Sequence, residues 1–276
     1  MGIITLTTDF GEKDHFVGAI KGAIYNELDD ARIVDISHLV TPFNIPEAAY
    51  IIQNAYKSFP KGSIHIIGID SELNPENKHI AVSLDDHYFI CANNGIMSMI
   101  CQEIVPEKIV EINIHDKIET SFPVLDVFVK VACHIARGGT LEVIGKVINT
   151  IKPIKNLVPY VNDEKNQIIG SVIYVDNYGN VVTNIKRKFF DNIQKTREYE
   201  ISARNHKFKQ IFKKYSDIVN FENEESKRNS DGKGLVVFNS SDYLEIAMYK
   251  SNWDNLGGAS TLMGLRVMDT VTVNFT

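Results

Sequence analysis

The stretch ITLTTDFGEKDHFVGAIKGAI, residues 4–24, sets the pattern for the first half of the chain. The apolar run IITLT (3–7) predicts a buried strand, and apolar residues then recur at the spacing of one helix face over 15–28. A strand that passes within a few residues into a helix is typical of α/β proteins. Two acids, Asp9 and Asp14, lie in the segment between them.

The same alternation continues to about residue 150. Further strands are predicted at RIVDI (32–36), IHIIGI (64–69), HIAVSL (79–84), YFICA (88–92) and KIVEI (108–112), and helices from Pro46 to Phe59, from about Ile96 and over 125–137. Alternating strands and helices predict an α/β N-terminal domain with a largely parallel sheet, which we place at residues 1–152.

The pattern changes in INTIKPIKNLVPY (148–160), which contains two prolines, and we place a linker at 153–165. The segments that follow are short and strand-like: IIGSVIYV (168–175), NVVTNI (180–185), EYEISA (198–203), KGLVVF (233–238), YLEIAM (243–248) and DTVTVNF (269–275). They predict a C-terminal antiparallel β-barrel domain at residues 166–276.

Composition excludes several classes of protein. The formal net charge is −6 and no Lys/Arg cluster suits a phosphate backbone, so we expect no nucleic-acid partner. No apolar run is long enough to span a bilayer and no secretion signal is visible, so we expect no membrane partner. The cysteines Cys91, Cys101 and Cys133 lack ligand spacing, which predicts no metal site and reduced thiols in a cytoplasmic protein.

Polar residues follow three of the predicted strands. Asp9, Asp70 and Asn93-Asn94-Gly95 come at strand ends, where open α/β sheets bind ligands. Asp14 has an equal alternative interpretation as a cap of the following helix. No GxGxxG, P-loop or GxSxG motif occurs, so dinucleotide binding, P-loop chemistry and a nucleophile elbow have no support.

Four segments together are more specific than any one of them. TTDFGEKDHFVGAIKG (7–22), NNG (93–95), VDNYGNVVTNI (175–185) and NSSDYLEIA (239–247) resemble, in order, the motifs of the S-adenosyl-L-methionine (SAM) hydroxide adenosyltransferases, relatives of the SAM-dependent fluorinase and chlorinase. The resemblance implies an α/β domain, a β-barrel, and a homotrimer with active sites at subunit interfaces. It also implies that water attacks C5′ of SAM, releasing adenosine and L-methionine, with no cofactor beyond the substrate.

The resemblance implies a role for each matching residue. Asp9 matches the acid that holds the ribose hydroxyls, and Phe43 matches an aromatic residue beside the ribose. The other implied contacts are with methionine for Asp14 and Asp176, with adenine for Tyr178 and Asn180, and with the substrate carboxylate for Ser240 and Ser241.

The catalytic positions depart from the family pattern. Asp70 keeps the catalytic acid, but the water-orienting Arg falls on Asn77 and the catalytic His falls on Pro123, where that chemistry is lost. The halide-binding Ser of the halogenases falls on Val124. The segment near 248–257 is longer than in the family, which affects the expected pocket shape.

The leading hypothesis is therefore a SAM hydrolase with weak activity. Two alternatives stay open: a non-catalytic binder of SAM or adenosine, and an enzyme that acts on another nucleoside in the same pocket. In the second alternative, Asp70 and either Lys78 or His79 would serve as acid and base.

Overall fold

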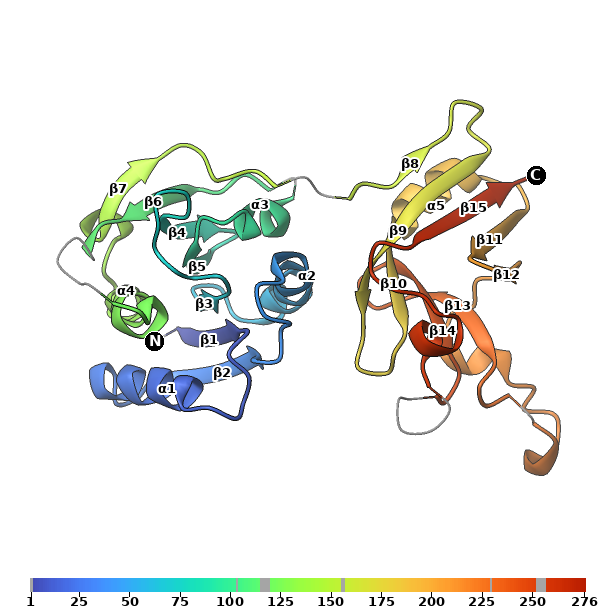
Figure 1. Ribbon diagram of the computed structural model, residues 1–276, viewed down its shortest axis with the longest axis horizontal. Helices are drawn as coiled ribbons and strands as arrows, with labels where there is room; N and C mark the ends of the chain where they lie inside the picture. Colours follow the sequence, from blue (N-terminus) through green and yellow to red (C-terminus); the bar gives the residue numbers. More distant parts are fainter. Residues whose placement is uncertain (1, 103, 115–119, 155–156, 229, 252–256) are drawn as a thin grey trace. The chain divides into compact units, whose positions relative to one another are not determined.

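The structure is a computed structural model that describes residues 2–102, 104–114, 120–154, 157–228, 230–251 and 257–276. The chain divides into two compact units, Met1–Lys155 and Asn156–Thr276. Each unit has its own sheet and its own core (Figure 1).

The sheet of the first unit has seven strands in the order β2-β1-β3-β5-β4-β6-β7. Their bounds are β1 Ile3–Thr8, β2 Arg32–Ser37, β3 Ile64–Gly68, β4 His79–Leu84, β5 His87–Ala92, β6 Lys108–Ile112 and β7 Gly145–Ile148. The pairs β1–β2, β1–β3 and β3–β5 are parallel, whereas β4 and β7 run against their neighbours. The predicted α/β domain with a largely parallel sheet is confirmed.

Helices cover both faces of this sheet (Figure 1). One face packs against α1 (Phe16–Glu27) and α4 (Val129–Ala136), and the other against α2 (Ile45–Ala55) and α3 (Ile96–Cys101). Successive strand residues face opposite ways, so Ile66 of β3 joins the first core and Ile67 the second. Burial on both faces explains why β3, all of whose residues are buried, is mainly apolar.

Two predicted helices differ from the observed ones at their ends. The helix predicted over 125–137 begins with a π-helical turn, Val124–Phe128, before it becomes α4. The helix predicted to reach Phe59 ends as α2 at Ala55 and continues as a 3₁₀ turn, Tyr56–Ser58. A further 3₁₀ turn at Leu141–Val143 and strand β7 are not predicted from the sequence. Elements of three and four residues are too short to show a periodic pattern.

A buried histidine pair lies at the amino ends of β3 and β5. Thr5 Oγ1 contacts His65 Nδ1 at 2.7 Å, and His65 Nε2 contacts His87 Nδ1 at 3.1 Å. Burial, together with the neighbouring His87, lowers the pKa of His65 to about 3. The His65 ring therefore stays neutral in the folded protein at neutral pH.

The second unit forms one curled sheet in which all paired strands are antiparallel. The order is β12-β11-β15-β9-β10-β14-β13, with β8 (Tyr160–Val161) paired to β9. The other bounds are β9 Gln167–Val175, β10 Val181–Lys186, β11 Tyr199–Ala203, β12 His206–Phe208, β13 Gly234–Phe238, β14 Tyr243–Met248 and β15 Thr270–Phe275.

Side chains from six of these strands meet in a single core, which identifies a nearly closed barrel. The core includes Ile168, Ile185, Ile201, Val236, Ile246 and Val273. The predicted β-barrel is thus confirmed. Helices α5 (Arg187–Gln194) and α6 (Ala259–Leu262) and the 3₁₀ turns Tyr215–Ile218 and Glu225–Lys227 lie between strands.

Two further segments bear on the sequence predictions. Strand β8 lies inside the segment that we placed as a linker, 153–165. The local sequence does not predict this strand, because it forms by pairing with β9 in the folded sheet. Of the long segment at 248–257, residues 252–256 lie outside the described residues. In the described part of the chain, none of the helices combines the length and apolar character needed to cross a membrane.

Candidate functional site

Asp9 and Asp70 come together at the carboxyl ends of two paired strands. The ladder between β1 and β3 places Thr8 opposite Gly68, so the chain on both strands reaches an acid within two residues. Asp9 Oδ2 accepts a hydrogen bond of 2.8 Å from the backbone N–H of Phe43, and a backbone hydrogen bond also joins Asp70 to the Asp9 carboxyl group. Asp9 thereby connects three segments of the first unit.

Both residues that contact Asp9 have left-handed backbone conformations. The φ angle is 62° at Phe43 and 42° at Asp70. A positive φ is rare for residues other than glycine and is costly for an aromatic residue. Hydrogen bonding to the Asp9 carboxyl group offsets part of that cost, and strain held in this way is typical of functional sites.

The electrostatic environment keeps the proton on Asp9 more tightly than usual. Burial raises the pKa of Asp9, and the charge of Asp70 raises it further. Backbone hydrogen bonds from Phe43 and Asp70 act in the opposite direction but do not cancel the effect of burial.

Polar side chains hydrogen-bond to the backbone carbonyl groups around Asp70. Asn94 Nδ2 donates to the Ile69 carbonyl at 3.0 Å and lies 3.4 Å from the Asp70 carbonyl. His79 Nε2 contacts the Ser71 carbonyl at 2.9 Å, and its ring packs edge-on to Phe128. His79 is fully buried and already engaged with the backbone, which disfavours its predicted alternative role as an acid–base group beside Asp70.

Asn77, at the Arg position of the family pattern, lies in the loop between β3 and β4. Its Oδ1 atom accepts a hydrogen bond of 3.0 Å from Lys152 Nζ, and the backbone N–H of Lys152 donates to Asn93 Oδ1 at 2.8 Å. A cation therefore contacts this position, although it comes from a distant segment of the chain. Lys78, the other alternative acid–base residue, is exposed.

Pro123, at the His position, is buried and stands immediately before the π-helical turn. Its neighbour Phe122 packs against Phe10 at 5.6 Å and Phe16 at 5.2 Å between ring centroids. The family pattern has a histidine at this position, whereas here apolar aromatic rings lie beside it, one of them on the Asp9 segment. A proline has no proton to transfer, so this position contributes shape alone.

Asp14 and Phe43 are exposed. Asp14 precedes α1, whose N-cap residue is His15 and which has no side-chain cap, so the capping interpretation of Asp14 has no structural support. The Phe43 ring is 73% exposed, although its backbone is held by Asp9. Both side chains are accessible to a ligand.

The Asp176 carboxylate in the second unit is occupied by its own turn. Oδ1 accepts the N–H groups of Tyr178 and Asn180, each at 2.8 Å, and Oδ2 accepts Asn180 Nδ2 at 3.0 Å. Tyr178 is 62% exposed, whereas Asn180 is buried. These hydrogen bonds close a turn between β9 and β10, and the exposed Tyr178 ring is accessible for stacking on a planar group.

Ser240 and Ser241 lie on a turn that is held by Asn239. Asn239 Oδ1 accepts the N–H groups of Ser241 at 3.0 Å and Tyr243 at 3.1 Å, and its Nδ2 donates to the buried Glu245 at 3.1 Å. The Ser240 side chain is exposed and Ser241 is partly exposed. The turn is therefore pre-formed and presents two hydroxyl groups.

Two further features of the described residues bear on the predicted site. No group of three or more His, Cys, Asp or Glu residues that could hold a metal occurs among the described residues. A hollow of about 480 Å³ in the second unit is lined by His206, Lys207, Phe208, Gly234, Met248, Leu262 and Met263, none of which is a predicted site residue.

Comparison with known proteins bears on this geometry. The model of the SAM hydroxide adenosyltransferase N-terminal domain matches residues 4–145, and that of the C-terminal domain matches 170–272. The chain belongs to the SAM hydroxide adenosyltransferase family. The resemblance inferred from four short motifs is confirmed over both units.

Individual relatives agree with this membership. The (R)-S-adenosyl-L-methionine hydrolase of Methanocaldococcus jannaschii is 29% identical over 99% of this chain and 96% of its own. A fluorinase of Actinopolyspora mzabensis is 23% identical over 70% of this chain and 73% of its own. A solved structure of an uncharacterized conserved protein from Thermotoga maritima has a TM-score of 0.83 at 29% identity, covering 99% of this chain and 100% of that one.

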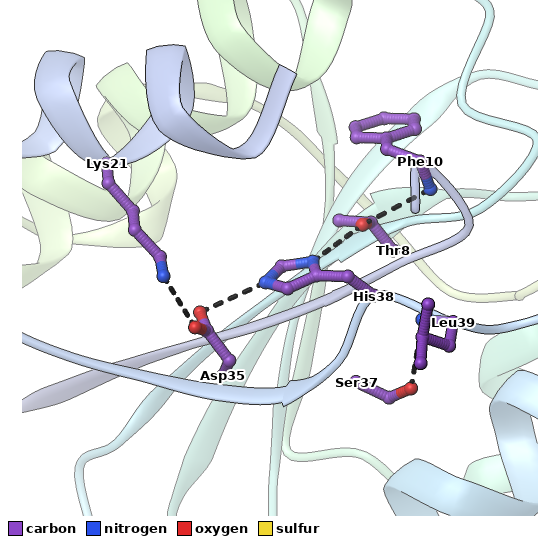
Figure 2. A network of polar contacts seen from close by, with 7 residues as sticks. All are labelled: Thr8, Phe10, Lys21, Asp35, Ser37, His38 and Leu39. Carbon is purple, nitrogen blue, oxygen red and sulfur yellow. Dashed lines mark hydrogen bonds and ion pairs between the residues drawn. The ribbon is translucent and has the colours of Figure 1, made fainter. Parts of the chain in front are cut away.

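Sequence reasoning missed one polar group in this family member. Thr8 Oγ1, in the residue before Asp9, contacts His38 Nδ1, and His38 Nε2 lies near the Asp35 carboxylate (Figure 2). The spacing of Asp35 and His38 at the end of a predicted strand was an available signal. That spacing alone does not identify a site, because an isolated histidine beside an apolar strand is commonly a core residue.

Proposed function

We propose that this protein hydrolyses SAM, so that SAM and water give adenosine, L-methionine and a proton. The observation that supports it best is the Asp9–Asp70 pair, held by strained backbone at paired strand ends in a member of the SAM hydroxide adenosyltransferase family. The relative that matches this chain nearly end to end is named (R)-S-adenosyl-L-methionine hydrolase.

The chemistry requires little covalent help from the protein. The sulfonium leaves readily because its departure turns a cation into a neutral thioether. The site has to hold one water in line with C5′ and exclude the rest, and Asp70 is our candidate for accepting a hydrogen bond from that water. Without the Arg and His at positions 77 and 123, we expect slow turnover.

The ligand-binding assignments remain part of the proposal. Asp9 would accept the ribose hydroxyls while Phe43 packs beside the sugar, which fits the half-buried carboxyl group and the exposed ring. Tyr178 and Asn180 would take the adenine, and Ser240 and Ser241 the carboxylate. The ammonium of the methionine moiety would pair with Asp14 and Asp176.

We also propose that the protein is a cytoplasmic homotrimer whose sites lie at subunit interfaces. The proposed ligand contacts come from both units, as such a site requires. The three cysteines are free and buried, which fits a reducing compartment. Light scattering should give three times the 31.1 kDa mass of the chain, and a monomer mass at micromolar concentration would contradict the trimer.

The deciding experiment is incubation of the protein with SAM in ¹⁸O-labelled water, followed by chromatography and mass spectrometry. Attack of water at C5′ predicts equal amounts of adenosine and L-methionine, with one ¹⁸O in the adenosine 5′-hydroxyl. Asp70→Asn serves as the control for non-enzymatic breakdown of SAM.

Calorimetry separates hydrolysis from the alternatives. Tight binding of SAM with no product would indicate a non-catalytic binder. Release of an unlabelled product, or turnover of another nucleoside alone, would indicate a different reaction. Absence of both binding and turnover would reject the proposal altogether.

A further inference from the structure

A chain of four polar side chains runs from the surface of α1 to the residue before Asp9 (Figure 2). Lys21 Nζ lies 2.5 Å from Asp35 Oδ2, His38 Nε2 lies 3.0 Å from Asp35 Oδ1, and His38 Nδ1 lies 2.8 Å from Thr8 Oγ1. Thr8 is fully buried and His38 is 4% exposed. The inner part of the chain is thus shielded from solvent.

The contacts assign the protons along this chain. The Thr8 hydroxyl accepts the N–H of Phe10 at 3.4 Å, so its own proton is available for His38 Nδ1. His38 Nε2 then carries the ring proton and faces the Asp35 carboxylate. The ring N–H is not aligned with Asp35 Oδ1, so this contact is electrostatic rather than a linear hydrogen bond.

Asp35 remains ionised beside these groups. Burial raises its pKa, but the hydrogen bond from Lys21 and the electrostatic interactions with Lys21 and His38 outweigh burial, and the net pKa is lowered. A carboxylate that stays charged fixes the tautomer and the orientation of the histidine ring. The ring in turn fixes the direction of the Thr8 hydroxyl.

His38 holds the Asp9 segment on both sides. Its ring contacts Thr8, which precedes Asp9, and its backbone carbonyl accepts the N–H of Gly11, which follows Asp9, at 2.8 Å. The segment in between carries the carboxyl group that accepts the N–H of Phe43. A shift of the ring would therefore move Asp9 relative to Phe43.

We infer that His38 is a positioning residue for Asp9, oriented by Asp35 and Lys21 through the chain in Figure 2. His38 touches neither of the proposed reacting atoms. Its effect on ligand binding is exerted through Thr8 and the backbone of residues 8–11. The effect on binding rests on the proposed function, because Asp9 is there the acid that holds the ribose.

Two substitutions separate the two sides of the ring. An asparagine amide reaches the position of Nδ1, so His38→Asn keeps the link to Thr8. A glutamine amide reaches that of Nε2, so His38→Gln keeps only the link to Asp35. His38→Ala removes both. Ser37→Ala is the matched control, since Ser37 Oγ makes a hydrogen bond within its own segment, where it accepts the Leu39 N–H at 3.2 Å.

The first measurement needs no ligand. Hydrogen exchange of the Phe43 amide, which is donated to Asp9, should be faster in His38→Gln and His38→Ala and unchanged in His38→Asn and Ser37→Ala. Equal exchange in all four variants, each folded by circular dichroism, would overturn the inference. If His38→Ala fails to fold, the Gln and Asn variants decide the matter.

The second measurement is adenosine affinity by calorimetry. His38→Gln should bind roughly three- to tenfold more weakly, the effect of one lost hydrogen bond, while His38→Asn stays close to the parent. In an Asp9→Ala background the same Gln substitution should cost nothing further. Additive losses would overturn the inference. A parent protein that binds neither SAM nor adenosine would reject the proposed function, whereas the exchange result would still decide the role of His38.

Discussion

The acids at two strand ends, Asp9 in the first unit and Asp176 in the second, have opposite surroundings. The Asp9 carboxyl group is held by backbone N–H groups from distant segments, at Phe43 and Asp70, both in left-handed conformation. The Asp176 carboxylate is occupied by its own turn, through Tyr178 and Asn180. Both acids follow a strand and precede a glycine-containing turn.

The difference separates an acid that serves ligand binding from one that first serves the fold. Asp9 connects three segments, and burial disfavours its ionised form. Such an arrangement is expected of a carboxylate that binds a substrate. Asp176 closes a local turn and would have to share its hydrogen bonds with an incoming ammonium group. The two acids are therefore expected to respond differently to the same substitution.

The largest effect is expected at Asp70. Asn tolerates the left-handed backbone, so Asp70→Asn removes the charge without disturbing the loop. SAM turnover should fall by roughly a hundredfold or more, while SAM affinity measured by calorimetry changes little. Asp86→Asn is the matched control, because Asp86 is also left-handed but is exposed in the β4–β5 hairpin. Parent-like turnover would assign the water contact to another group.

The next largest effect is expected for Asp9→Ala. Losing a charged acceptor from a partly buried site should weaken adenosine binding roughly thirtyfold or more. Asp14→Ala is the control: it should weaken SAM through the ammonium but spare adenosine. If Asp9→Ala binds both compounds like the parent, Asp9 is a structural acid of the same kind as Asp176, and the contrast between the units disappears.

Acid pH should lower the stability of the first unit, and His65 is the group expected to cause it. Its folded pKa, about 3, lies below the ordinary value of 6.5, so the unfolded chain binds the extra proton first. The free energy of unfolding should therefore fall as pH drops from 6.5 toward 3, by about 1.4 kcal/mol per pH unit. Denaturant titrations at several pH values measure this slope.

A variant tests whether His65 causes this pH dependence of the free energy of unfolding. His65→Gln should reduce this slope. Glu245 in the second unit acts with the opposite sign: burial, together with the charge of Asp176, raises its pKa above 4.5, so its contribution to stability decreases as pH rises above that value. An unchanged slope in His65→Gln would assign acid sensitivity to other groups.

The smallest effect is expected for Asp176→Ala, and it concerns stability. Removing the acceptor of three hydrogen bonds in a turn should lower the free energy of unfolding by about 1 kcal/mol, as loss of a capping side chain does. Asp231→Ala, at an exposed loop position, is the control. Urea unfolding that is unaffected by Asp176→Ala would show that the turn needs no capping carboxylate.

Much of the fold could be predicted because its signals are local. Apolar runs and helical periodicity over 3–112 identify the elements of the first unit, since each reflects burial of a single segment. The π-helical turn at Val124–Phe128 and the strand β8 cannot be predicted from the local sequence, for a common reason. Their backbone conformation depends on partners elsewhere in the chain, so the local pattern does not specify it.

The features of the candidate site likewise divide into those with local sequence signals and those that depend on contacts between distant segments. The sequence by itself determined that Asp9 and Asp70 end strands, that the chain belongs to the SAM hydroxide adenosyltransferase family, and that Arg and His are absent at positions 77 and 123. Only the tertiary structure decided that Asp9 is held by the backbone of Phe43, that Lys152 contacts Asn77 and that His38 contacts Thr8, the residue before Asp9. These contacts join residues far apart in the chain. Their geometry arises from strand register and loop packing, which no short stretch of sequence encodes.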